Sequence, residues 1–171
     1  APAVNGFGYT YPRLEKIVNR AYMGIIRKTP KIWDYLYDNP KVFKRSQSLK
    51  KFLNKSSHNK IAALLKQYHP ETIVCTQAFP CGMVADYKRT YKSDLPLIAV
   101  LTDFAPHSYW IYDEVDYYIT PSEDVSLLLI KKGVSIDKIR ALGIPFDHKF
   151  NVSLERDKIL HKYKLSYEIN P

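Results

Sequence analysis

Residues 97–110, LIAVLTDFAPHSYW, carry the strongest fold signal in the chain. They begin with a continuous apolar run, which is typical of a strand buried on both faces of a parallel sheet. The run gives way at once to Asp103, His107 and Trp110. Open α/β sheets bind their ligands just beyond the carboxyl ends of their strands. The stretch therefore predicts a parallel sheet together with a ligand site at one of its edges.

Similar short apolar runs lie on either side of this strand, and helical patterns separate them. Alternation of this kind is typical of βαβ units, whose right-handed crossovers bring all carboxyl ends to one edge. We therefore expect an α/β fold, a Rossmann-like parallel sheet flanked by helices. The expected strands are 72–76, 97–102, 115–120 and 139–142, and the expected helices between them are 61–68, 82–91 and 122–132.

The remaining segments are interpreted from their prolines, glycines and apolar spacing. Residues 1–10 contain Pro2, Gly6 and Gly8, so a loop is expected there. Helical spacing predicts an amphipathic helix over 12–28 and a helical tail over 153–163. A short helix is expected at 32–37, and loops at 77–80, 103–110, 121–123 and 143–145 share the carboxyl edge of the sheet.

The composition indicates a globular protein with an anionic partner. The chain has 171 residues, 46% of them hydrophobic and 25% charged, which suits one folded domain. Lys and Arg number 26 against 17 acids, for a formal charge of +9. That excess favours nucleic acid, a phosphorylated substrate or an acidic lipid surface. The 14 tyrosines are scattered along the chain, which argues against nucleic acid.

The cysteines and the lengths of the apolar runs bear on metal binding, cellular compartment and membrane contact. The spacing of Cys75 and Cys81 fits no metal-binding motif, so no metal site is expected. We interpret both as reduced thiols in a cytosolic setting. No apolar run approaches the ~20 residues that span a bilayer. Any contact with a membrane is therefore expected at its surface.

Asp103 and His107 are the best candidates for chemistry. They lie four residues apart in a strand-end loop, so both can face one cleft. His107 could act as a base, with Asp103 orienting it or accepting a substrate hydroxyl. The plain alternative is that Asp103 caps the turn and His107 is a solvated loop residue.

Aromatic and amide side chains at the same edge are candidates for ligand contacts. Tyr109 and Trp110 could pack on a sugar or lipid chain, although Trp110 could equally fill the core beneath the loop. Gln77 offers both a donor and an acceptor, or belongs to a simple turn around Pro80. No glycine-rich turn joins a strand to a helix, so no phosphate cradle is expected in this chain.

A basic segment at 41–60 is the candidate membrane contact. Each cation near an anionic lipid surface contributes about 1 kcal/mol, with aromatic side chains dipping inward. The alternative is an ordinary solvated helix face. The residues expected to touch the membrane are Phe43, Lys44, Arg45, Lys50, Lys51 and Phe52.

Three ordered stretches together resemble one enzyme family. They are VLTDFAPHSYW at 100–110, VDYYITPSEDVSLLLIKKGV at 115–134 and KIRALGIPF at 138–146. With 31–39 and QYHPETIVCTQAFP at 67–80, they are similar to the acceptor-side domain of the monogalactosyldiacylglycerol synthase family, which includes the processive diacylglycerol glucosyltransferases. The likeness covers residues 10–150.

The resemblance implies half of a GT-B glycosyltransferase that acts at a membrane surface on the cytoplasmic side. In this picture Asp103 and His107 line the lipid-acceptor side of the cleft, His107 in a supporting role. The UDP-sugar is expected to bind a second domain that is absent, so no cofactor is expected in this chain. The residues expected to contact the diacylglycerol-type acceptor are Gln77, Phe79, Tyr109, Trp110 and Ser122.

The family pattern also sets expected boundaries. Residues 1–145 form the acceptor-side domain, which lacks the family's first strand and its glycine-rich loop. Residues 146–171 form a linker and the start of the nucleotide-sugar domain. We therefore expect no transfer activity from these residues alone. Two alternatives stay open: an enzyme that uses a polyprenyl-linked acceptor, and a non-catalytic lipid-binding module.

Overall fold

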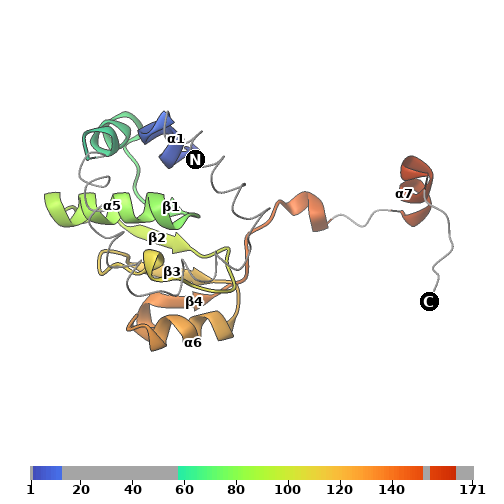
Figure 1. Ribbon diagram of the computed structural model, residues 1–171. Helices are drawn as coiled ribbons and strands as arrows, with labels where there is room; N and C mark the ends of the chain where they lie inside the picture. Colours follow the sequence, from blue (N-terminus) through green and yellow to red (C-terminus); the bar gives the residue numbers. More distant parts are fainter. Residues whose placement is uncertain (1, 13–57, 152–154, 165–171) are drawn as a thin grey trace, which may run out of the picture.

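A four-stranded parallel sheet forms the centre of the computed structural model, which describes residues 2–12, 58–151 and 155–164. The spatial order of the strands follows the chain, and each pairs in parallel with the next (Figure 1). The predicted α/β parallel sheet is confirmed. The strands are β1 (Ile73–Cys75), β2 (Leu97–Val100), β3 (Tyr117–Thr120) and β4 (Ile139–Ala141).

One face of the sheet forms the core with two helices, α5 (Ala78–Tyr91) and α6 (Glu123–Lys131). Buried side chains from both helices join buried strand residues in a single apolar cluster. Register places the cluster's strand residues on the same face of the sheet. They are Cys75, Leu97, Ala99, Tyr118 and Ile139.

The opposite face is more open in the described part of the chain. Val74 and Tyr117 are exposed there, although Val100 is buried and Ile98 is half-buried. The expectation that β2 is buried on both faces is therefore met at Val100 and met only in part at Ile98. Parallel sheets are normally covered on both faces, and the described residues cover this face only in part.

Two predicted loops are wrong because helices begin earlier than expected. In the first ten residues, α1 (Gly6–Thr10) forms a short helix despite its glycines. Asn5 caps it, since its Oδ1 accepts the Gly8 N–H at 3.0 Å. Likewise α5 starts at Ala78, so Pro80 lies in the first helical turn, where its missing N–H costs nothing.

Other boundaries shift by a few residues. β2 ends at Val100 and β3 begins at Tyr117, two residues inside the predicted limits at each point. The C-terminal helix α7 (Arg156–Tyr163) starts after the predicted residue 153. The helix predicted at 61–68 is present as helix 58–68. The predicted helix at 32–37, and that at 12–28 beyond residue 12, lie outside the described residues.

A charged pair joins α5 to the amino ends of β2 and β3. The buried Lys88 ammonium donates to Asp116 Oδ2 at 2.6 Å, and the same oxygen accepts the Leu97 N–H at 2.7 Å. Desolvation acts to raise the pKa of Asp116, but these two hydrogen bonds, with the positive charges of Lys88 and Lys138, outweigh it and hold that pKa below the ordinary value. The ionised carboxylate therefore stabilises the fold.

We predict that Asp116→Asn destabilises the protein in a pH-dependent way. At pH 7 it leaves a buried ammonium without its anion, which costs about 1–3 kcal/mol. Because the pKa of Asp116 is lowered by folding, its contribution is present above the unfolded value near ~3.9 and is lost as pH falls through the folded value. Thermal melts should therefore show a deficit at pH 7 that shrinks below about pH 4.

Asp113→Asn is the matched control, since Asp113 lies three residues earlier and is exposed. It should leave the melting temperature nearly unchanged at both pH values. A deficit for Asp116→Asn that stays constant from pH 7 to pH 3 would contradict the assignment.

Candidate functional site

The candidate site lies where the parallel strands end. After β1 the chain enters α5 at Gln77, and after β3 it enters α6 at Ser122. Between them comes loop 101–116, which follows β2 and contains the 3₁₀ turn η1 (Ser108–Trp110). Because β2 pairs with both β1 and β3, this loop leaves the sheet between the amino ends of two helices. This is the edge at which the sequence predicted a ligand site.

Tyr118 of β3 fixes loop 101–116 against the sheet. Its Oη donates to the Tyr112 carbonyl and accepts the Tyr112 N–H, each at 3.0 Å. Burial raises the pKa of Tyr118 far above its ordinary value, so the phenol keeps the proton that it donates. One side chain thus satisfies both backbone groups of a loop residue. The sequence signals neither contact, because they depend on how the loop folds back.

The same loop lies close to α5. A Cβ at Gly82 would clash with the Tyr112 phenol, so the helix needs a glycine at this point for the two elements to approach. Trp110 is 1% exposed and belongs to the core cluster. Of the two roles considered for this indole, the structure gives it the core beneath the loop. This burial favours the core role, and contact of Trp110 with a ligand stays a prediction.

Asp103 and His107 stand in the same loop, but in different surroundings. Asp103 is exposed, whereas His107 is half-buried and its ring centroid lies 5.7 Å from that of Tyr109 and 6.3 Å from that of Trp110. Within the described chain, no hydrogen bond joins Asp103 to His107. The imidazole therefore packs on two aromatic rings, while Asp103 is exposed to an incoming polar group.

Of the three remaining candidate residues for acceptor binding, one is exposed and two contribute to the structure of the domain. Gln77 is exposed and its side chain makes no capping bond to α5. Phe79 is half-buried and packs against the core cluster. The Ser122 Oγ accepts the Val125 N–H at 3.4 Å and so caps α6, a role that the sequence S-E-D at the helix start could have indicated. Only Gln77 of these three is fully available to a ligand.

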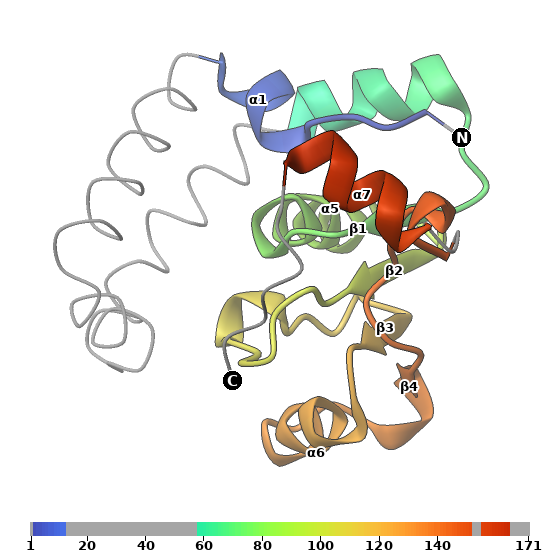
Figure 2. The same cartoon turned by 90° about the vertical axis from the view of Figure 1, so that its right-hand side faces the viewer.

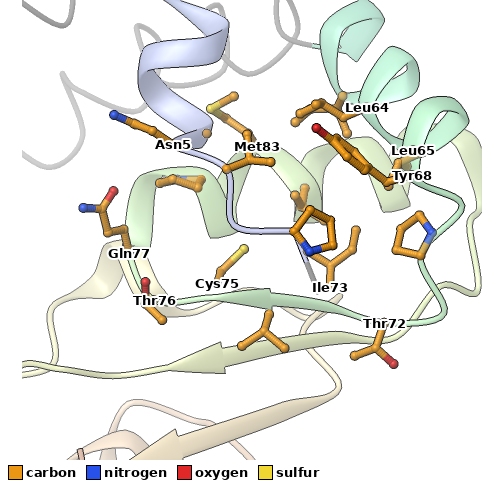
Figure 3. A pocket seen from close by; sticks show the side chains of 18 of the residues that line it. Asn5, Leu64, Leu65, Tyr68, Thr72, Ile73, Cys75, Thr76, Gln77 and Met83 are labelled. Atoms are coloured by element: carbon orange, nitrogen blue, oxygen red, sulfur yellow. The ribbon is translucent and has the colours of Figure 1, made fainter. Parts of the chain in front are cut away.

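A groove beside β1 was not predicted from the sequence. Its volume is about 730 Å³, and it lies between β1, helix 58–68, α5 and the segment before α1 (Figure 3). Asn5 and Gln77 stand at one end of it, and Thr72 at the other (Figure 3). The apolar residues of helix 58–68 that line it are Ile61, Leu64, Leu65 and Tyr68.

The expected membrane-contact residues at 43–52 lie outside the described residues. In the parts of the chain that the structure describes, no helix is long and apolar enough to cross a bilayer. The same residues hold no group of three side chains suited to bind a metal ion. No disulfide joins Cys75 to Cys81, and both side chains are buried.

Comparison with known proteins gives a consistent family signal. The model for monogalactosyldiacylglycerol (MGDG) synthase matches residues 4–146. A processive diacylglycerol beta-glucosyltransferase of Bacillus licheniformis is 30% identical over 112 residues, which cover 66% of this chain and 29% of the relative. One from Bacillus cytotoxicus is 27% identical over 163 residues, covering 95% of this chain and 41% of the relative. The chain thus spans less than half the length of these relatives.

One solved structure also aligns. The apo form of lipopolysaccharide outer core galactosyltransferase WaaB matches 58% of this chain and 29% of its own, with 14% identity and a TM-score of 0.46. A likeness this slight carries no argument about function.

We predict that Tyr118→Phe loosens the candidate site. Removal of the hydroxyl takes one hydrogen-bond partner from each backbone group of Tyr112, although the Val115 N–H still donates to its carbonyl, at a cost of about 1–3 kcal/mol. The melting temperature should fall by several degrees, and amide exchange in residues 108–112 should accelerate. Tyr117→Phe, one residue earlier on the exposed face, is the control and should change neither quantity. Equal exchange rates in the two variants would show that Tyr118 does not hold the loop.

Proposed function

Because its residues 4–146 match the family model, this chain belongs to the monogalactosyldiacylglycerol synthase family, and we propose that it is the acceptor-side half of a lipid glycosyltransferase. The proposed reaction transfers a hexose from a UDP-sugar to a diacylglycerol-type acceptor. The observation that carries the proposal is the extent of the match, which includes the whole sheet and every loop at its carboxyl edge. The names of the relatives support the lipid acceptor.

In the proposed reaction the acceptor hydroxyl gives its proton to a base in the part of the complete polypeptide outside this chain, and its oxygen bonds to the anomeric carbon of the sugar. The bond from that carbon to the UDP oxygen breaks, and UDP leaves with the electron pair. Asp103 would accept a hydrogen bond from the hydroxyl, since its carboxylate is exposed at the edge. His107, packed against Tyr109 and Trp110, would support the loop and face the acceptor.

The donor would bind outside this chain. None of its six glycines forms a glycine-rich turn from strand to helix, the arrangement that cradles phosphates on helix N-termini. We therefore place the UDP-sugar on a second, GT-B domain of the complete polypeptide, joined through residues 146–171. Those residues include α7, which Figure 1 shows well apart from the sheet.

The lipid acceptor implies work at a membrane surface, on the cytoplasmic inner face. The formal charge of +9 supports attraction to anionic headgroups. Phe43, Lys44 and Arg45, with Lys50, Lys51 and Phe52, are the proposed contacts.

We predict that Asp103→Asn in the complete polypeptide lowers kcat for hexose transfer to diacylglycerol by roughly 10²-fold, with a smaller loss for His107→Asn. The KM for the UDP-sugar should stay unchanged, because the donor binds elsewhere. Initial rates in mixed micelles, with a panel of UDP-sugars, measure both quantities.

Two variants at the opposite edge serve as controls. Asp94→Asn and His69→Asn make the same chemical changes at exposed positions before β2 and β1, and should leave kcat unchanged. If Asp103→Asn behaves like Asp94→Asn, the carboxyl edge is not the acceptor side. If no UDP-sugar is turned over by the unaltered polypeptide, the proposed reaction is wrong.

We also predict that the complete polypeptide sediments with anionic vesicles and much less with neutral ones. Replacement of the four basic residues Lys44, Arg45, Lys50 and Lys51 by Gln should weaken this binding by roughly 10²-fold or more, at about 1 kcal/mol per cation. Binding that is insensitive to these changes would place the membrane contact elsewhere on the protein.

A further inference from the structure

The carboxyl edge of the sheet carries exposed apolar side chains beside its polar ones. Phe104 is 68% exposed and directly follows Asp103. Leu142 is 74% exposed and directly follows β4, and Ile144 is 36% exposed two residues later. Single exposed apolar side chains are ordinary on a protein surface, but these three lie at the edge where the sheet binds its ligand. We call Phe104, Leu142 and Ile144 the edge patch.

Backbone hydrogen bonds to β3 hold the two parts of the edge patch on either side of that strand. The Leu101 N–H donates to the Ile119 carbonyl at 2.8 Å, just before the chain leaves the sheet towards Phe104. On the other side, the Leu142 N–H donates to the Thr120 carbonyl at 3.2 Å. Neighbouring strands lie about 4.8 Å apart, so the backbones at Leu101 and Leu142 are separated by roughly 10 Å.

The edge changes from polar to apolar in the order of the strands. Figure 2 faces the side towards which the strands point, with β1 uppermost and β4 below. Gln77 follows β1 and Asp103 follows β2, and both are exposed. Leu142 and Ile144 follow β4, at the far side of the sheet. An amphipathic molecule can therefore lie across the edge with its polar end near β1 and β2 and its apolar end near β4.

Charge decides which polar end suits this edge. The chain has a formal charge of +9, yet its sequence has no lysine or arginine in the segments that directly follow the four strands. These segments are 76–77, 101–107, 121–122 and 142–147. They contain Asp103 and Asp147, and the first turn of α6 adds Glu123 and Asp124. An anionic headgroup would meet carboxylates here, which is unfavourable, whereas an uncharged hydroxyl can donate to Asp103.

The dimensions of the edge fit a lipid that carries one free hydroxyl. Asp103 lies two residues past Leu101, so the backbone span from Asp103 to Leu142 is at most about 17 Å. One lipid chain covers half of the ~30 Å hydrocarbon core of a bilayer, or about 15 Å. A chain attached through glycerol to a hydroxyl at Asp103 therefore passes Phe104 and reaches Leu142.

We propose that the edge patch is the contact surface for a hydrocarbon chain of an uncharged lipid acceptor, whose hydroxyl lies at Asp103. The chain runs past Phe104 towards Leu142 and Ile144. Phe104 and Leu142 are then specificity-determining residues, because they favour acceptors with long chains over those with short ones. This inference rests on the proposed function and adds to it the place and direction of the acceptor's apolar part.

The test compares two acceptors on the complete polypeptide, dibutanoylglycerol and dioctanoylglycerol, each dissolved in water below the concentration at which it aggregates. They present the same hydroxyl and differ in chain length, and calorimetry gives both Kd values without turnover. Phe104→Ser and Leu142→Ser should each raise the Kd of dioctanoylglycerol roughly 10-fold, the size expected when about two methylene groups lose an apolar contact. The Kd of dibutanoylglycerol should stay nearly unchanged.

Two further variants serve as controls. Ile136 is aliphatic and 68% exposed, but it precedes β4 and so lies at the opposite edge. Ile136→Ser should therefore leave both Kd values unchanged. Phe104→Leu keeps an apolar side chain at the edge patch and should keep most of the preference for dioctanoylglycerol.

The outcomes separate the edge patch from the proposed reaction. An unchanged chain-length preference in both Phe104→Ser and Leu142→Ser would overturn the edge patch, even if hexose transfer is observed. An equal loss of both affinities, with a melting temperature lowered by several degrees, would overturn it too, because the patch would then pack against another part of the polypeptide. Chain-selective binding that responds to these variants, without hexose transfer to either acceptor, would support the edge patch and overturn the proposed reaction.

Discussion

Parallel pairing of neighbouring strands fixes where everything else in this molecule can lie. Since all four strands point the same way, each strand's exit and each following helix start meet at one edge. Tyr118 then determines what that edge looks like, because its hydroxyl holds both backbone groups of Tyr112. With the loop tied down, Trp110 fills the core and His107 packs above it. The exposed Asp103 is thus presented by a firmly held support.

The edge also shows how structural roles compete with ligand binding for the same side chains. Ser122 and Trp110 both stand at strand ends, where a ligand is expected, yet one caps a helix and the other is buried. The amino end of a helix needs a capping group, and a loop needs an apolar side chain that packs in the core. Some residues at the carboxyl edge of the sheet therefore serve these structural roles and not ligand binding. Position at the edge alone therefore does not separate contact residues from supporting ones.

Features that depend on local pattern were predictable from the sequence, and those that depend on distant contacts were not. The apolar runs at 97–101 and 72–76 revealed the strands, and alternation with helices revealed their parallel order. The early start of α5 was missed because residues 77–80 were interpreted as a loop around Pro80, although the first turn of a helix tolerates proline. The groove was missed because it arises where helix 58–68 and the segment before α1 meet β1. Separate sequence windows carry no sign of that meeting.

The match between chain order and spatial order of the strands has a consequence for how the sheet assembles. Each pairing closes a loop of only roughly twenty residues, so its entropic cost is small and much the same from one pair to the next. Parallel pairing is slow because it joins residues that lie apart in the sequence, and the short separations here keep each pairing as local as a parallel sheet allows. A sheet in which chain order and spatial order agree can therefore be completed one neighbouring strand at a time, without threading one strand between two that are already paired.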